Sequence, residues 1–148
     1  MKRVIISIFI IASILSCGHQ LNSKVEEAVH IISKEKVVYP SWATENEAFQ
    51  NLYKQTSLED LLYLTENENV YVRYYAFIGL REKNYSKILD IYNKHKNDFE
   101  EMSTSNGACL GGSFEIRLLM LTALNPENPK YKWLSQTKYD KLLKEQFK

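Results

Sequence analysis

Three side chains in the C-terminal half of the chain could together perform nucleophilic catalysis. His95 and Asp98 form a His-x-x-Asp pair, and Cys109 follows them along the chain. A thiol paired with a histidine and an orienting carboxylate is a known catalytic arrangement. The structural alternative is that His95 interacts with a helix dipole, Asp98 begins a loop, and Cys109 is a buried small hydrophobic residue. No recognised nucleophile motif surrounds Cys109, so a thiol enzyme stays an alternative hypothesis.

The remaining histidines and acidic residues do not predict a metal site. His19, His30 and His95 are scattered, without paired cysteines or the i,i+4 histidine spacing of zinc sites. Glu66 and Glu68 lie in a polar turn that lacks the alternating acids and central glycine of a calcium loop. We therefore expect no metal and no other cofactor.

The N-terminus has the pattern of an export signal. Lys2 and Arg3 precede an apolar run from Val4 to Leu15, and Cys17 follows this run closely. The run holds 12 residues, whereas a helix needs about 20 to span a bilayer. The sequence therefore predicts a segment that is removed after export, not one that stays as a membrane helix.

The segment Ile14-Leu15-Ser16-Cys17 resembles the lipobox of bacterial lipoproteins. The resemblance implies that the Cys17 thiol is acylated, becomes the new N-terminus and anchors the protein to a membrane on the exported side of the cell envelope. Because Gly18 is not aspartate, the outer membrane is favoured if the cell has one. The predicted organisation is a signal peptide over 1–16, a tether over 17–22 and a single helical domain over 23–148.

The composition favours helices and gives no reason to expect nucleic-acid binding. Without Lys2 and Arg3, 17 basic and 18 acidic side chains remain, so the exported part is close to neutral. Glycine and proline are few, and leucine, isoleucine, lysine, glutamate and asparagine dominate. With Cys17 acylated, Cys109 has no cysteine partner within the chain.

Apolar spacing and capping residues predict helices that are joined by polar turns. Thr44 with Glu47, and Ser57 with Asp60, have the spacing of capping boxes. The predicted helices begin near residue 23 and cover 45–54, 58–65, 70–81, 87–96, 114–124 and 137–147, with a short helical turn over 129–134. Asp98 to Ser113 is predicted to be a loop of roughly 15 residues, in which Glu100 and Glu101 form a solvated turn.

Two of the predicted helices have similar sequences. The segment Val72–Leu80 aligns with Ile116–Leu124 at an offset of 44 residues, which matches Arg73 with Arg117. Periods of 40–47 residues are typical of HEAT and armadillo repeats. The stretch 57–124 resembles HEAT repeats, in which a Val-Arg pair on the second helix is followed by alanine and leucine. The resemblance implies a scaffold that binds other proteins, with no catalytic residues.

The predicted fold is all-α, either a short HEAT-like α-solenoid or an irregular helical bundle of about six to seven helices. Arg73 is too costly to bury without a partner, and we expect it to meet Asp60 or Asp90. The predicted core contains Leu61, Leu62, Val72, Ala76, Leu80, Ile88, Leu89, Ile116, Leu119, Met120 and Leu124.

The candidate partner-binding residues are Tyr71, Arg73 and Tyr74, because tyrosine and arginine are enriched in binding hot spots. The two tyrosines either form an exposed ridge or are covered by a second layer of helices. The main functional hypothesis is a non-catalytic envelope scaffold with a protein partner of unknown identity. The alternatives are an immunity-type inhibitor that sequesters a toxic enzyme, and a thiol enzyme that uses Cys109.

Overall fold

The computed structural model describes residues 19–105, 111–128, 130–131 and 133–147. The described chain is mostly helical, with seven α-helices, one 3-10 helix and one antiparallel sheet of two strands. In chain order the elements are α1 (Ser23–Ile32), η1 (Pro40–Glu45), α2 (Glu47–Gln55), α3 (Leu58–Leu64), α4 (Val70–Glu82), α5 (Ile88–His95), β1 (Glu101–Ser105), β2 (Gly111–Glu115), α6 (Ile116–Thr122) and α7 (Gln136–Glu145). The predicted signal peptide, Cys17 and Cys109 lie outside the described residues.

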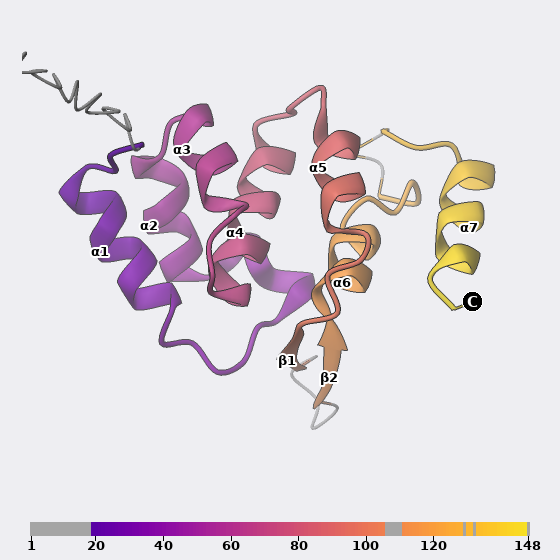
Figure 1. The fold of residues 1–148 in the computed structure, drawn as a ribbon, viewed down its shortest axis with the longest axis horizontal. Coiled ribbons are helices and arrows are strands. Elements are labelled where there is room, and N and C mark those ends of the chain that lie inside the picture. The colour runs from indigo at the N-terminus through magenta and orange to yellow at the C-terminus, as the bar shows by residue number, and fades with distance from the viewer. Residues whose placement is uncertain (1–18, 106–110, 129, 132, 148) are drawn as a thin grey trace, which may run out of the picture.

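The helices follow one another across the molecule in chain order, from α1 at one end to α7 at the other (Figure 1). The helix α4 lies at the centre and packs against α1, α2, α3, α5, α6 and β1. Every residue from Val72 to Leu80 is buried. Because α4 is enclosed by neighbours, its sequence is apolar around the whole helix instead of along one stripe.

The predicted core is confirmed at most of its positions. The buried members are Leu61, Val72, Ala76, Leu80, Ile88, Ile116, Leu119, Met120 and Leu124, whereas Leu62 and Leu89 are only partly buried. At Gly79, an added Cβ atom would lie 2.9 Å from Leu61 Cδ2. Glycine at this position therefore allows α3 and α4 to approach each other closely.

Capping explains where several helices begin. The predicted capping box at the start of α3 is confirmed, because the Ser57 hydroxyl accepts a hydrogen bond from the Asp60 N–H and the Asp60 carboxylate accepts one from the Ser57 N–H. The other predicted box is wrong. Thr44 lies within η1, and the Asn46 side chain caps α2 by accepting a hydrogen bond from the Phe49 N–H.

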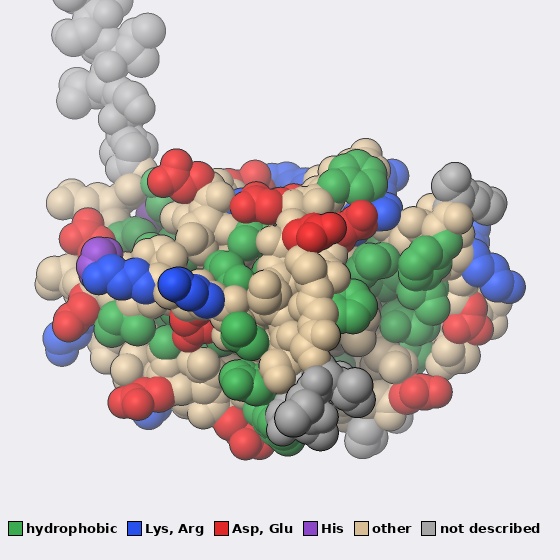
Figure 2. All heavy atoms as spheres, turned by 90° about the horizontal axis from the view of Figure 1, so that it is seen from below, with side chains coloured by type: hydrophobic (Ala, Val, Ile, Leu, Met, Phe, Trp, Pro, Cys, Tyr) green, Lys and Arg blue, Asp and Glu red, His purple; other side chains and the backbone are tan. Residues whose placement is uncertain are grey.

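The segment predicted as a long loop over 98–113 contains a β-hairpin. The strands pair with Met102 opposite Phe114, and Met102 is buried. The predicted helix over 114–124 therefore begins later, at Ile116 in α6, because Phe114 belongs to β2. Figure 2 shows the underside of the molecule, where hydrophobic side chains gather between the hairpin and α7.

The C-terminal part also differs from the prediction. Of the predicted helical turn over 129–134, Pro129 and Lys132 lie outside the described residues. The described residues form a turn at Lys130 and bends at 133–134, and none of them is helical. The helix α7 is capped by the Ser135 hydroxyl, which accepts a hydrogen bond from the Lys138 N–H. No helix in the described ranges is long and apolar enough to cross a membrane.

Candidate functional site

Arg73 lies near the start of α4 and is only 7% exposed. The turn between α3 and α4 supplies two of its acceptors. Arg73 Nη1 donates to the main-chain oxygens of Asn67 and Glu68, at 2.8 and 2.9 Å. The Asn69 side chain fixes the end of this turn, because it caps α4 by accepting from the Tyr71 N–H at 3.0 Å.

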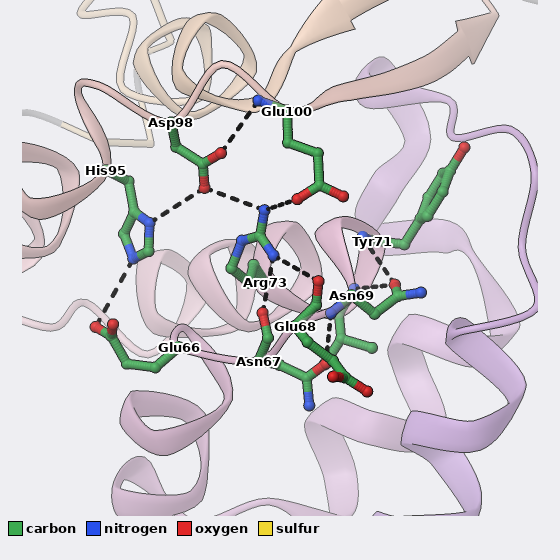
Figure 3. Close-up of polar contacts among 10 residues, drawn as sticks. Glu66, Asn67, Glu68, Asn69, Tyr71, Arg73, His95, Asp98 and Glu100 are labelled. Atoms are coloured by element: carbon green, nitrogen blue, oxygen red, sulfur yellow. Dashed lines mark hydrogen bonds and ion pairs between the residues drawn. The ribbon is translucent and has the colours of Figure 1, made fainter.

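Two carboxylates from the segment between α5 and β1 supply the other acceptors of the guanidinium (Figure 3), whereas its buried Nε has no hydrogen-bond partner among the described residues. Arg73 Nη2 lies 3.1 Å from Asp98 Oδ2 and 2.6 Å from Glu100 Oε2. The expectation that Arg73 meets Asp60 or Asp90 is therefore wrong. Asp60 caps α3 and accepts a hydrogen bond from His19 Nε2 at 2.8 Å, and Asp90 is exposed on α5.

His95 lies on the other side of Asp98, at the end of α5. Its Nδ1 atom is 3.5 Å from Asp98 Oδ2, and its Nε2 atom is 3.8 Å from Glu66 Oε1. The side chain is 9% exposed, and Nε2 has no hydrogen-bond partner among the described residues. His95 and Asp98 are thus neighbours, as a catalytic pair requires, but Cys109 lies outside the described residues and its place in such a triad stays a prediction.

The tyrosines on α4 have different surroundings. Tyr71 is partly buried, and its hydroxyl donates to the Lys36 main-chain oxygen at 3.0 Å and accepts from the Ser103 N–H at 3.3 Å. Tyr74 is 1% exposed and packs against Tyr75. Burial raises the pKa of Tyr74 to about 12, although the positive charge of Arg81 lowers it somewhat. Tyr74 therefore belongs to the core and offers no exposed ridge.

An open groove runs along the side of this cluster, and Tyr71 lines it together with α1 and the turn before α4. The groove also passes the start of β1. Its lining contains four glutamates and one histidine, and within the described part of the chain no lysine or arginine lines it. The charged and titratable lining residues are Glu26, His30, Glu68, Glu100 and Glu101.

Arg73 is buried and holds the edge of this groove in place. It is not an exposed hot spot that a partner could contact. Glu100 is 51% exposed and lines the groove, while its other side is bound to the buried guanidinium. The interpretation of Glu100 and Glu101 as a plain solvated turn is therefore wrong, because Glu100 binds Arg73 and Glu101 is the first residue of β1. No local pattern could have revealed the groove, because its glutamates come from three separated segments of the chain.

A second, smaller cavity lies near Tyr74 and contains a compact ion-pair network. The Glu82 carboxylate accepts hydrogen bonds from Arg81, Lys130 and Tyr131. Burial alone would raise the pKa of Glu82, but these hydrogen bonds outweigh it and lower the pKa below its ordinary value. The network ties the end of α4 to the segment before α7.

Neither cluster has the geometry of a metal centre. Within the described ranges, no group of three or more histidine, cysteine, aspartate or glutamate side chains could hold a metal ion. Compared with family models, with curated proteins and with solved structures, the chain matches none.

Proposed function

We propose that the protein is a non-catalytic protein-binding module, anchored at the bacterial cell envelope by a lipid on Cys17. The lipobox-like segment Ile14-Leu15-Ser16-Cys17 supports the anchor. The binding role is carried by one observation, the groove beside Tyr71 that is lined by four glutamates. Such a groove attracts a basic segment of a partner protein and forms charge-assisted hydrogen bonds with it.

We also propose that α3 to α6 are two HEAT-like units. In support, α3 packs on α4, α5 packs on α6, and the matched residues Arg73 and Arg117 lie near the start of the second helix of each pair. Each arginine ties its helix to other parts of the chain, because Arg73 binds Glu100 and Arg117 Nη1 donates to Gln146 Oε1 at 2.8 Å. The hairpin between α5 and α6 is an addition to the repeat pattern.

The contacts of Arg73 and His95 favour binding over catalysis. The Nη atoms of Arg73 are directed at the α3–α4 turn and at Asp98 and Glu100, so the cation organises the molecule. His95 is enclosed between Asp98 and Glu66, with little exposed surface. Arg73 positions the groove through the α3–α4 turn and Glu100, and the exposed glutamates are left to meet a partner.

The proposal is tested by crosslinking the intact protein in its native envelope, followed by mass spectrometry. We expect one dominant partner at near-equal amount, and an N-terminal peptide that begins with acylated Cys17. Reversing a groove charge with Glu26→Lys should reduce the yield of this partner about tenfold, because the electrostatic attraction becomes repulsion.

Glu27→Lys is the matched control, since Glu27 is exposed on the same helix but does not line the groove. Equal loss of capture in both variants would mean that the groove is not the binding site. No protein partner above background would contradict the binding role itself. A toxic enzyme as the partner would identify the protein as an immunity-type inhibitor.

A further inference from the structure

The two outer edges of the β-hairpin are covered unequally. The outer edge of β1 is closed, because the Val38 N–H donates to the Ser103 main-chain oxygen and the Ser105 N–H donates to the Val38 oxygen, both at 2.9 Å. Tyr71 also accepts from the Ser103 N–H. By contrast, the sheet of the described chain has only two strands, so no third strand pairs with β2. In Figure 1, β2 lies on the side of β1 that faces open space below α7.

The hydrogen-bond pattern identifies the main-chain groups on the open edge. Val38 forms hydrogen bonds with the main-chain groups of odd-numbered residues in β1. The main-chain groups of the even-numbered residues of β1 therefore point toward β2. The Ile116 N–H that donates to the Glu100 oxygen at 2.9 Å agrees with this alternation. From the strand register, the main-chain groups of Gly112 and Phe114 then face β1. Those of Gly111, Ser113 and Glu115 point away from the hairpin.

The sequence of β2 protects this edge only weakly, through the charge of Glu115 at its end. Natural proteins block an open strand edge with lysine, proline, a bulge or a covering segment. The strand Gly111–Glu115 contains neither lysine nor proline, and its residues pair one to one with β1. An edge of this kind accepts an additional strand from another chain, which is a common mode of peptide recognition.

The side chains beside the edge indicate the chemistry of the added strand. On one face of the hairpin, Glu101 lies directly opposite Glu115. Glu115 already pairs with Arg117. Glu101, by contrast, is exposed and accepts a hydrogen bond only from the Ser113 hydroxyl among the described residues, at 2.7 Å, so one negative charge is left without a cation on this face. A lysine or arginine on a third strand would lie beside Glu115, and its long side chain could reach across β2 toward Glu101. On the other face Phe114 is 48% exposed, and hydrophobic side chains continue from the hairpin toward α7 (Figure 2). An apolar residue of the third strand would cover this surface.

We propose that β2 binds an extended segment of a partner protein in which basic and apolar residues alternate, added as a third strand of the hairpin. The basic side chains face Glu115 and Glu101, and the apolar side chains face Phe114. The inference rests on the proposed function only in that the ligand is a protein. It uses a different surface from the glutamate-lined groove, although Glu101 borders both.

The first test uses a short synthetic peptide of alternating lysine and valine, added to the intact protein and followed by NMR. We expect hydrogen exchange to slow at the amides of Gly111, Ser113 and Glu115, and to change little at Gly112 and Phe114, which β1 already protects. Ser113→Pro removes an outward N–H and should weaken binding about tenfold, whereas Ser113→Ala should not. Unchanged thermal unfolding of Ser113→Pro would show that the fold survives.

The second test varies the charge and leaves the main chain intact. Ser113→Lys should weaken binding of the lysine–valine peptide and favour a matched glutamate–valine peptide, because it places a cation on the face of the two glutamates. Protection of other amides, or binding that is equal in Ser113→Pro and Ser113→Ala, would overturn the proposal. The proposal would also be overturned if the protein self-associates and Ser113→Pro abolishes this self-association. In that case β2 would pair with a second copy of the protein.

The two proposals can fail separately. The peptide experiment contains no natural partner, so its failure leaves the crosslinking result unaffected. Conversely, peptide binding at β2 with no partner captured in the envelope would contradict only the proposed function in the cell.

Discussion

At the scale of single residues, Arg73 is the position whose residue type depends most clearly on its surroundings in the fold. A guanidinium that is almost fully enclosed needs several acceptors, and it finds two main-chain oxygens and two carboxylates. The sequence correctly requires an acid near Arg73, but it does not identify which one. Asp98 and Glu100 lie beyond α5 in the chain, and only the turn after α5 brings them to the start of α4.

Replacing this cation should destabilise the protein strongly. We expect Arg73→Met to lower the free energy of unfolding by about 3 kcal/mol, because Asp98 and the enclosed oxygens of Asn67 and Glu68 lose their donor. Urea unfolding measures the change. Glu100→Gln is the matched control and should cost less than about 1 kcal/mol, because Glu100 is half exposed. Equal stability of Arg73→Met and the natural protein would show that the contacts of Arg73 contribute nothing.

At the scale of elements, local signals predict the helices well and fail where pairing is distant. Ser57 and Asp60 carry a complete capping signal, and α3 begins where it predicts. The hairpin was missed because Gly111 and Gly112 read as loop residues and β2 has no buried alternation of its own. Its strands are stabilised by Val38 and α4, which are remote in sequence. The groove could not be predicted for the same reason, because its lining residues are far apart in the sequence.

The cap of α4 offers a test at this scale. Asn69 accepts hydrogen bonds from the Tyr71 and Val72 N–H groups, and its Nδ2 donates to the Ser33 oxygen. Asn69→Ala should therefore lower the free energy of unfolding by about 1–2 kcal/mol. Asn69→Asp retains the acceptor at a helix N-terminus and should cost only about 0.5 kcal/mol. Circular dichroism during urea unfolding distinguishes these outcomes, and equal losses would exclude capping as the cause.

At the scale of the whole molecule, the core is rich in tyrosines that must stay neutral. Burial is the main cause that raises the pKa values of Tyr74, Tyr75, Tyr92, Tyr131 and Tyr139. A raised pKa in the folded state favours folding below the pKa of the unfolded chain, and this contribution is lost as pH rises through the folded value. The protein should therefore become less stable in strongly alkaline solution.

For Tyr74, the pH range over which this stability is lost can be stated. Its pKa rises from 10.0 to about 12, so its contribution is complete below pH 10 and disappears as pH approaches 12. Tyr74→Phe should reduce the alkaline loss of stability by up to about 3 kcal/mol. Urea unfolding as a function of pH measures it, with Tyr39→Phe as the exposed control. An identical alkaline profile for Tyr74→Phe would show that Tyr74 does not couple to folding.

The bridge between Val38 and Thr104 also bears on the order of folding. It joins segments on either side of α2 to α5, so it closes a long loop whose entropic cost is repaid only after the intervening helices have formed. We expect the helical centre around α4 to assemble first and the hairpin to dock late. Until docking, β1 and β2 both present unpaired edges, and this is the interval in which the chain is most prone to aggregation.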